Sequence, residues 1–317
     1  MDFLQFTAGK DDERRADKVL RLLLPNQHLS AIYSAFRKGF IRVNDKRIKP
    51  DKAIHHGDTI SIASFLLCST SNQQDMCAPA VFPYDIILKN DDVLVINKPY
   101  NIEVQHELVQ VVRQYYNSQK NGGRASLTFA PAPLHRLDKK TTGLLFFSWS
   151  IRGAQWFSRA IAEHKIEKQY VALVQGEMTQ QHEWNDFIKK NAATDNAAFH
   201  TVRVFTSAHE NALLAQTKAK PLCTSSSGIT LVHFTIATGR THQIRAQSAQ
   251  HGYPLLGDTA YGARSTHEEQ DIFLHAYKMI LPENELGLPR VLRAPLPRPF
   301  KKINDKILKN WQEAFIL

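Results

Sequence analysis

The stretch LHRLDKKTTGLLFFS, residues 134–148, places a single carboxylate, Asp138, among basic side chains and then continues into an apolar run. The segment TGLLFFSW, residues 142–149, predicts a buried strand because its core is continuously apolar. Asp138 could therefore be a nucleophile, a turn cap or one half of an ion pair. Its residue type alone favours the turn cap, because short polar side chains before a glycine often hydrogen-bond their own backbone.

Length and composition favour an ordinary globular protein with two domains. The chain has 317 residues, 43% of them hydrophobic, which is enough for two cores. No apolar run is long enough to span a membrane, and the first residues lack the order of a signal peptide, so we expect a cytoplasmic protein. The cysteines, Cys68, Cys77 and Cys223, are odd in number and lack metal-type spacing, which argues against a disulfide framework or a zinc site.

Residues 11–62 have the pattern of a small independent module. Apolar residues at helical spacing predict helices within 11–25 and 30–39, with Ser30 as N-cap and Gly39 as terminator. Alternation then predicts a hairpin turning at residues 44–45 and a closing strand in GDTISIA, residues 57–63.

This module also carries a dense cluster of positive charge, in a chain whose formal net charge is +10. Between residues 37 and 52 there are two Asp and seven cations: Arg37, Lys38, Arg42, Lys46, Arg47, Lys49 and Lys52. Phosphate binding needs several cations on one rigid face, so the cluster favours a nucleic-acid partner. The alternative is a solvated charged face.

The rest of the chain reads as a linker followed by a larger domain. Residues 64–83 are polar, contain proline and show no sustained period, which indicates a linker. Strands are predicted at 92–99, 142–149 and 168–176, with an amphipathic helix within 150–165. Because strands and helices do not alternate regularly, an α+β fold fits better than a doubly wound sheet.

Three residues in this domain could supply chemistry: Asp138, Tyr170 and Arg245. An arginine is the fixed cation that keeps a buried carboxylate ionised, and an ionised carboxylate can attack a glycosidic carbon. A lone acid argues against a standard glycoside hydrolase, which uses a pair. Residue type alone makes Tyr170 a core residue, and a metal site at His135, His242 and His251 is disfavoured because they lack close spacing.

Several motifs, taken together, identify a family. HRLDKKTTGLL resembles the HRLDxxTSG signature of the RluA family of pseudouridine synthases. In family order follow KQYVALVQG, TGRTHQIRAQSAQHGYPLLGDTAYG, LHAYKMIL and APLP, while DVLVINKP precedes the signature. The module before them resembles an S4 RNA-binding domain, and RKGFIRVNDKRIKP suggests the branch that modifies large-subunit ribosomal RNA.

The resemblance implies a domain organisation and a fold. It gives an S4 domain at 11–63, a linker at 64–83 and a catalytic domain at 84–317. The fold would be α+β, with a mixed, largely antiparallel central sheet flanked by helices and loops, preceded by the small α/β S4-type domain.

The resemblance also implies an activity and assigns residues to it. The protein would isomerise uridines to pseudouridine in RNA, most readily 23S ribosomal RNA, as a monomer without cofactor, metal or membrane. Asp138 would attack the flipped uridine, Tyr170 would stack on the base and take part in proton transfer, and Arg245 would pair with Asp138. Arg136 would hold the flipped conformation or fill the vacated stack. The RNA-binding residues would be Arg136, Arg37, Lys38, Arg42, Arg47 and Arg240.

Three departures from the family pattern are visible, and two other functions stay open. Thr142 replaces the usual Ser, Asn101 replaces a Gly, and Gln247 stands where His is common. Residues 178–228 follow the family least, which leaves target choice open, including transfer RNA. The alternatives are an inactive RNA-binding ribosome-assembly factor on this scaffold, and a nucleobase glycosylase that releases the base.

Overall fold

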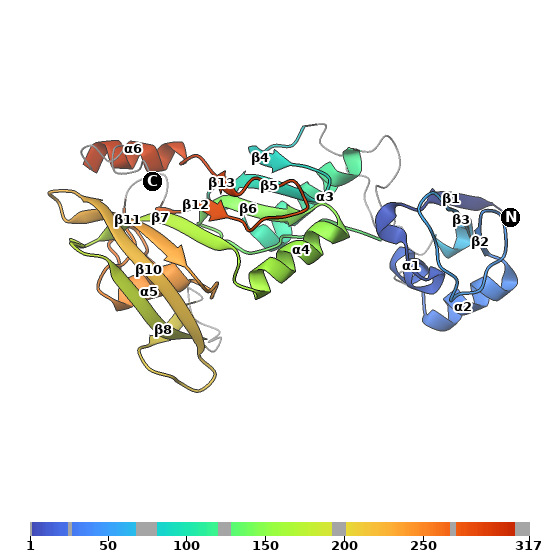
Figure 1. Ribbon diagram of the computed structural model, residues 1–317, viewed down its shortest axis with the longest axis horizontal. Helices are drawn as coiled ribbons and strands as arrows, with labels where there is room; N and C mark the ends of the chain where they lie inside the picture. The colour runs from blue at the N-terminus through green and yellow to red at the C-terminus, as the bar shows by residue number, and fades with distance from the viewer. Residues whose placement is uncertain are drawn as a thin grey trace.

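The computed structural model describes residues 2–24, 27–67, 81–119, 128–191, 201–266 and 271–307. Pro25, Cys68, Cys77 and most of the predicted linker lie outside these ranges. Two sheets organise the described residues, one of three strands and one of ten. Figure 1 shows the smaller sheet in a module at one end of the molecule and the larger sheet in the remainder.

The N-terminal module, residues 2–67, packs two helices against the small sheet. Its helices are α1 (Ala16–Leu23) and α2 (Leu29–Lys38), with short 3-10 turns at Lys10–Asp12 and Ser64–Leu66. Strands β1 (Phe3–Thr7), β3 (Thr59–Ala63) and β2 (Ile41–Val43) pair antiparallel in that order. The prediction did not anticipate β1. Their apolar faces form one core that includes Leu20, Phe36 and Ile62.

The caps of α2 confirm one sequence prediction and correct another. Gly39 ends the helix with φ +74, a left-handed conformation that glycine adopts without steric cost. Ser30 is not the N-cap: His28 occupies that position, and Ser30 lies within the first turn. The predicted hairpin turn is present, because Asn44 and Asp45 both have positive φ and the amides of Val43 and Lys46 donate to each other's carbonyl oxygens.

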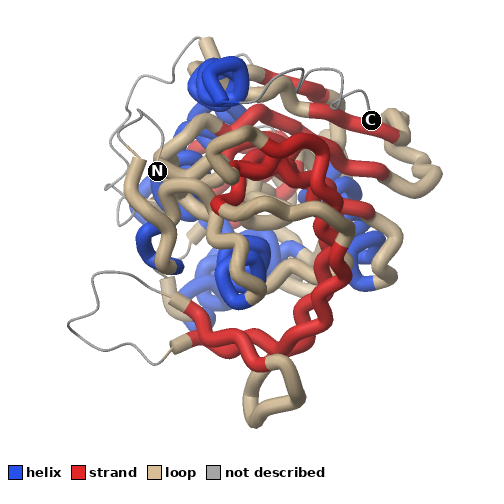
Figure 2. Tube along the Cα trace, turned by 90° about the vertical axis from the view of Figure 1, so that its left-hand side faces the viewer, coloured by secondary structure: helices blue, strands red, loops and turns tan. Residues whose placement is uncertain are grey.

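The large sheet is mixed and largely antiparallel, as expected from the resemblance. Its order is β4-β5-β6-β12-β7-β11-β10-β8-β9, with β13 paired to β12. Among the described strand pairs, β6 and β12 alone run parallel. Figure 2 shows the strands as a twisted band with helices beside it. The strands are β4 (Ile86–Lys89), β5 (Val93–Lys98), β6 (Thr142–Ser148), β7 (Glu167–Gln175), β8 (His182–Lys190), β9 (Val202–Phe205), β10 (Leu213–Thr224), β11 (Ile229–Ile236), β12 (Leu274–Ile280) and β13 (Val291–Arg293).

Helices cover both faces of this sheet because its central strands are apolar on both sides. Along β6, Leu145 and Phe147 join the core that contains α3, while Leu144 and Phe146 join the core that contains α4. The continuous apolar run of the opening stretch is therefore a strand buried on both faces. The helices are η4 (Val104–Leu108), α3 (Val109–Ser118), α4 (Ile151–Ala162), α5 (Gln243–Gln250), η5 (Thr259–Tyr261) and α6 (Arg298–Ile307). None of the described helices is long and apolar enough to cross a membrane.

Hydrogen bonds join the N-terminal module to the large domain. The Asp12 side chain is fully buried and accepts from the Thr128 amide at 2.9 Å and the Thr128 hydroxyl at 2.6 Å. Asp11 accepts from the Ile151 amide at 3.2 Å, at the start of α4. Because a buried carboxylate is costly unless hydrogen-bonded, these contacts dock the module in one orientation.

Candidate active site

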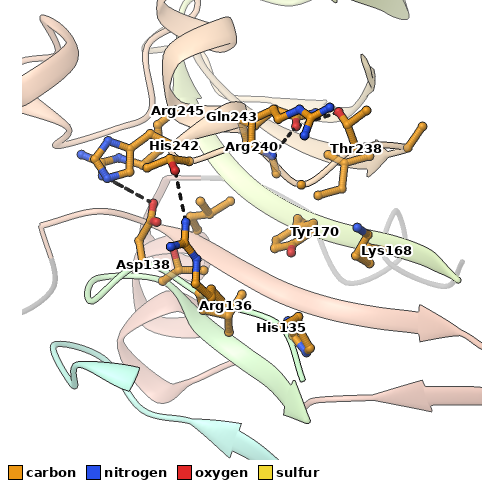
Figure 3. Close-up of a pocket in the computed structure, with 18 of the residues that line it drawn as sticks. His135, Arg136, Asp138, Lys168, Tyr170, Thr238, Arg240, His242, Gln243 and Arg245 are labelled. Carbon is orange, nitrogen blue, oxygen red and sulfur yellow. Dashed lines mark hydrogen bonds and ion pairs between the residues drawn. The ribbon is translucent and has the colours of Figure 1, made fainter. Parts of the chain in front are cut away.

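A cavity of about 430 Å³ opens between three segments that are far apart in the sequence. It is lined by the turn before β6 (residues 134–141), the first half of β7, and the loop 236–245 that leads into α5. Figure 3 shows Asp138, Tyr170, Arg245, Arg136 and Arg240 around this cavity. The structure thus brings together the three candidate catalytic residues and two of the predicted RNA-binding arginines.

Asp138 lies at one side of the cavity with its carboxylate directed at two side chains of the 242–245 segment. The Asp138 Oδ2 atom is 3.5 Å from Arg245 Nη1 and 3.9 Å from His242 Nε2. The turn closes through the backbone instead, where the Thr141 amide donates to the Asp138 carbonyl at 3.0 Å. Among the described residues no backbone amide donates to the Asp138 carboxylate, so the turn-cap interpretation of that side chain is not supported.

Arg245 is held mainly by a second acid, Asp258, rather than by Asp138 alone. Its Nε and Nη2 atoms donate to the two carboxylate oxygens of Asp258 at 2.7 and 2.9 Å. The Asp258 side chain is 1% exposed, and its bidentate pairing fixes the plane of the guanidinium. Burial opposes the charge, but the hydrogen bonds and charge of Asp258 raise the pKa of Arg245 overall. Sequence reasoning missed Asp258, although it lies within the quoted GDTAYG motif.

His242 stands beside Asp138 at the N-terminus of α5. It has φ +54, a strained left-handed conformation for a non-glycine residue, and its Nδ1 atom lies 3.0 Å from the Tyr261 hydroxyl. Burial lowers the pKa of His242, and the Asp138 charge opposes that shift. The Tyr261 ring also lies under the Arg245 guanidinium, 5.1 Å from its Cζ atom. This ring therefore supports both neighbours of Asp138.

Tyr170 extends from β7 into the cavity and is mostly buried in the large core. Burial raises the pKa of its phenol, and the nearby charge of Asp138 raises it further. The side chain is therefore a neutral phenol at physiological pH. It can stack on a flat ring and donate a hydrogen bond, but it is a poor base.

Lys98 is a second residue that sequence reasoning missed. It is fully buried at the end of β5, and its Nζ donates to the carbonyl oxygens of Pro99 and Lys139, both at 2.9 Å. The second bond fixes the residue next to Asp138. Burial lowers the pKa of Lys98 to about 8, against the opposing charges of Asp138 and Glu107. The available signal was a lysine at the end of an apolar strand, in VLVINKP.

The predicted RNA-binding residues fall into two separate groups. Arg136 is exposed at the cavity and donates from Nη2 to the Thr241 hydroxyl at 3.1 Å, while Arg240 donates from Nε to the Leu214 carbonyl at 2.9 Å. Arg37, Lys38 and Arg47 are exposed on the N-terminal module. Arg42 there donates to the Gly39 carbonyl at 3.2 Å and lies over the Phe3 ring. Figure 1 shows α2 and β2, which carry or adjoin this second group, well away from β7 and α5.

Each of the three residues that depart from the family pattern fits its local surroundings through its backbone conformation or its hydrogen bonds. Asn101 has φ +61, and Asn is among the few non-glycine residues that tolerate this region. The Thr142 hydroxyl lies 2.8 Å from His275 Nδ1 in the core. Gln247 is fully buried, and it donates to Asp186 Oδ2 at 2.7 Å and accepts from the Thr217 hydroxyl at 2.7 Å. None of these three residues lines the cavity at Asp138.

The histidines singled out in the sequence do not converge on one point. Burial lowers the pKa of His135 to about 3, and its Nε2 accepts the Phe146 amide at 3.2 Å. His251 is 2.9 Å from Asp186 and stacks on Trp184 with ring centroids 4.9 Å apart. In the described part of the chain, no three His, Cys, Asp or Glu side chains are grouped so that they could hold a metal ion.

Comparison with known proteins yields consistent matches. The sequence model described as RNA pseudouridylate synthase matches residues 92–250. The chain is 29% identical over 312 residues to the Ribosomal large subunit pseudouridine synthase C of Buchnera aphidicola subsp. Schizaphis graminum, covering 93% of this chain and 94% of the relative. The protein of the same name from Escherichia coli O6:H1 is 27% identical over 323 residues, covering 93% of each chain.

Solved structures share the fold of the large domain. Human RNA Pseudouridylate Synthase Domain Containing 4 superposes with a TM-score of 0.56 at 22% identity, over 71% of this chain and 94% of that one. Human RNA Pseudouridylate Synthase Domain Containing 1 gives the same TM-score and identity over 74% and 96%.

Proposed function

Since this chain belongs to the family of RNA pseudouridylate synthases, we propose that it isomerises uridines of 23S ribosomal RNA with Asp138 as the nucleophile. The chain is an RNA pseudouridine synthase, an isomerase, by its family. The observation that carries the assignment to Asp138 is its position in the cavity, with the Arg245 guanidinium 3.5 Å from its carboxylate. Relatives named for the ribosomal large subunit, matched along nearly their whole length, support the choice of RNA.

The geometry supports a division of labour among the side chains. Asp138 attacks C1′ of the uridine, so that a bond from its carboxylate to C1′ forms while the bond between C1′ and N1 breaks. After the base turns, C5 bonds to C1′ and the bond between C1′ and Asp138 breaks. The hydrogen on C5 leaves as a proton and N1 gains one, so mass is conserved. Tyr170, a neutral phenol, stacks on the base and orients it. Arg245 and His242 position the Asp138 carboxylate.

The uridine has to leave its stack to reach this cavity. Base-modifying enzymes extrude their target, and loops or bulges of RNA make the extrusion least costly. Arg136 is exposed at the rim beside Asp138 and is tethered to Thr241, which suits a role in holding the flipped nucleotide. The N-terminal module, taken as an S4 domain, would hold the RNA backbone through Arg37, Lys38, Arg42 and Arg47.

We also propose that the enzyme acts as a monomer in the cytoplasm. The cavity and its polar supports come from a single chain, which supports a monomer. Ribosomal RNA as the substrate supports the location. Sedimentation equilibrium of the purified protein would test the first point, since a dimeric mass contradicts it.

The deciding experiment compares the wild type with Asp138→Asn. Pseudouridines are mapped in RNA from three kinds of cell: cells with the wild-type enzyme, cells without the enzyme, and cells with the variant in its place. We expect the wild type to restore one or more sites in 23S ribosomal RNA, and Asp138→Asn to restore none while binding the RNA fragment with nearly unchanged affinity. Glu183→Gln, an exposed acid paired with Lys218, is the matched control and should restore the sites.

The same experiment separates the alternatives. If the wild type modifies transfer RNA instead, the substrate assignment is wrong. If it isomerises no uridine at all, the catalytic assignment fails and an RNA-binding assembly role takes its place; the grouping of Asp138, Tyr170 and Arg245 around one cavity counts against that outcome. A glycosylase would release the free base and so reduce the mass of the RNA, whereas isomerisation leaves the mass of the RNA unchanged.

A further inference from the structure

The far end of the cavity, away from Asp138, holds a lysine that the proposed chemistry does not use. Lys168 lies two residues before Tyr170 on β7, so both side chains project from the same face of the strand into the cavity. Figure 3 shows them next to one another, with Asp138 on the opposite side of Tyr170 from Lys168. The Lys168 ammonium lies near Gly239, because a Cβ atom added to that glycine would stand 3.5 Å from Nζ, an ordinary van der Waals distance.

Among the described residues, no acid balances the positive charge near Lys168. In the part of the chain that the structure describes, no carboxylate lies within ion-pair distance of its Nζ, and the charged neighbour that perturbs it is Arg240. Burial and this second cation both lower the pKa of Lys168. His135, which also lines this end, is neutral because burial lowers its pKa to about 3.

Arg240 is fixed in place but keeps donors for a ligand. Its Nε donates to the Leu214 carbonyl at 2.9 Å, and its backbone amide donates to Gln243 Oε1 at 3.0 Å. Gln243 is itself anchored to the Gln216 carbonyl and the Thr217 hydroxyl. The two terminal nitrogens of the guanidinium make no hydrogen bond among the described residues, so they can bind an anion as a fork.

Among the described residues that line the cavity, the positive charge at its far end therefore has no acid beside it. Asp138 is already neighboured by Arg245 and His242, so it does not compensate the charges of Lys168 and Arg240. A partly buried pair of cations without a counter-ion is unfavourable until an anion enters.

We propose that Lys168 and Arg240 form a phosphate subsite that binds the RNA backbone next to the target uridine. The inference rests on the proposed function, because it takes the sugar carbon of a flipped uridine to lie at Asp138. A nucleotide held there by its sugar carries a phosphate on its 5′ side and one on its 3′ side. The subsite binds one of these, and so fixes the depth to which the nucleotide enters the cavity.

The test combines a protein variant with a change of the RNA. Lys168→Met removes the charge at nearly constant length, and Lys165→Met is the matched control, because Lys165 is exposed and pairs with Glu163 at 2.7 Å. The RNA is a stem–loop of 23S ribosomal RNA that the protein binds, with a uridine in its loop, and a neutral methylphosphonate replaces the phosphate on the 5′ or the 3′ side of that uridine. Single-turnover kcat/KM and equilibrium affinity are measured for each pair.

The subsite predicts a specific pattern of losses. Lys168→Met should lower kcat/KM about 10- to 100-fold on normal RNA, the range for a hydrogen bond to a charged group. One of the two methylphosphonates should lower the kcat/KM of the wild type by a similar factor. The same methylphosphonate should lower the kcat/KM of Lys168→Met hardly at all. Lys165→Met should behave as the wild type does.

Two results would overturn the subsite. A normal kcat/KM for Lys168→Met excludes it, and so do independent, multiplying losses from the variant and both methylphosphonates, which would indicate that Lys168 only supports packing. If the wild type isomerises no uridine, the proposed function fails. The affinity measurements still decide the subsite in that case, because they compare the same RNAs without requiring chemistry.

Discussion

Replacing Asp258 by Asn tests whether a second acid positions the arginine beside Asp138, the proposed nucleophile. Asp258→Asn keeps the shape of the side chain and one carbonyl acceptor, but it removes the charge and one of the two hydrogen bonds of 2.7 and 2.9 Å. A hydrogen bond to a charged group contributes about 1.5–3 kcal/mol, and removing one partner of a buried ion pair costs about 3–5 kcal/mol. Because Asn retains one acceptor, we expect a loss of about 2–4 kcal/mol in the free energy of unfolding.

The assay measures thermal stability and turnover together. At about 2–4 °C per kcal/mol, the predicted loss lowers Tm by about 5–15 °C. A misplacement of about 1 Å in a catalytic group can cost on the order of 100-fold in rate, so we expect kcat to fall by about that factor with little change in RNA affinity. Glu183→Gln is the control, because its pair with Lys218 is exposed and contributes about 0–1 kcal/mol.

Two outcomes would contradict this reasoning in different ways. A wild-type Tm and kcat for Asp258→Asn would show that the bidentate pair does not hold Arg245. A lower Tm with unchanged kcat would show that Asp258 stabilises the fold but that its hold on Arg245 does not matter to the Asp138 carboxylate.

Three further predictions concern Lys98, the basic cluster and the contact between domains. Burial lowers the folded-state pKa of Lys98 to about 8 from 10.5, so the unfolded chain binds more protons between these pH values. The free energy of unfolding of the wild type, relative to that of Lys98→Met, should therefore rise as pH increases through that window. Urea unfolding that gives the same difference between the two proteins at pH 7 and at pH 10 would refute this. RNA binding should weaken when Gln replaces Arg37, Lys38, Arg42 and Arg47. The slope of the logarithm of the RNA-binding constant against the logarithm of salt concentration should become less steep by up to about 0.7–0.9 per lost phosphate contact. An unchanged slope contradicts the assignment of these residues to an RNA-facing surface. Asp12→Ala removes the acceptor of both Thr128 hydrogen bonds and should increase the rate of proteolysis between the two domains. The control is Asp51→Ala, because Asp51 is exposed. An unchanged cleavage rate for Asp12→Ala would contradict the prediction.

Local patterns in the sequence accounted for much of the fold. The continuous apolar run after Asp138 predicted β6, and the alternation in KQYVALVQG predicted β7. Both predictions were possible because the order of apolar and polar residues along a strand indicates whether one or both of its faces are buried. β1 was missed because its position in the small sheet depends on pairing with β3, more than fifty residues along the chain. The contact of Asp12 with Thr128 is likewise a long-range choice with no local signal.

The sequence named the candidate catalytic residues that line the cavity, but it did not name the side chains that support them. Asp138, Tyr170 and Arg245 came from the resemblance, whereas residue type alone made Asp138 a turn cap. The predicted pairing of Arg245 with Asp138 was incomplete. Asp258 reaches Arg245 only after the chain turns back beyond α5, and nothing in GDTAYG shows which side chain it meets.

The unequal contacts of Arg245 with Asp258 and Asp138 explain how one arginine can position the proposed nucleophile without occupying its oxygens. Asp258 takes the two short hydrogen bonds, and Asp138 is left with a single contact of 3.5 Å. A carboxylate clamped by a bidentate arginine has its lone pairs occupied, which suits an anchor and not an attacking group. His242, whose pKa is lowered by burial, does not add a second strong cation. Among the described residues that line the cavity, Asp138 is therefore the one acid that is held in position while its oxygens stay available to react.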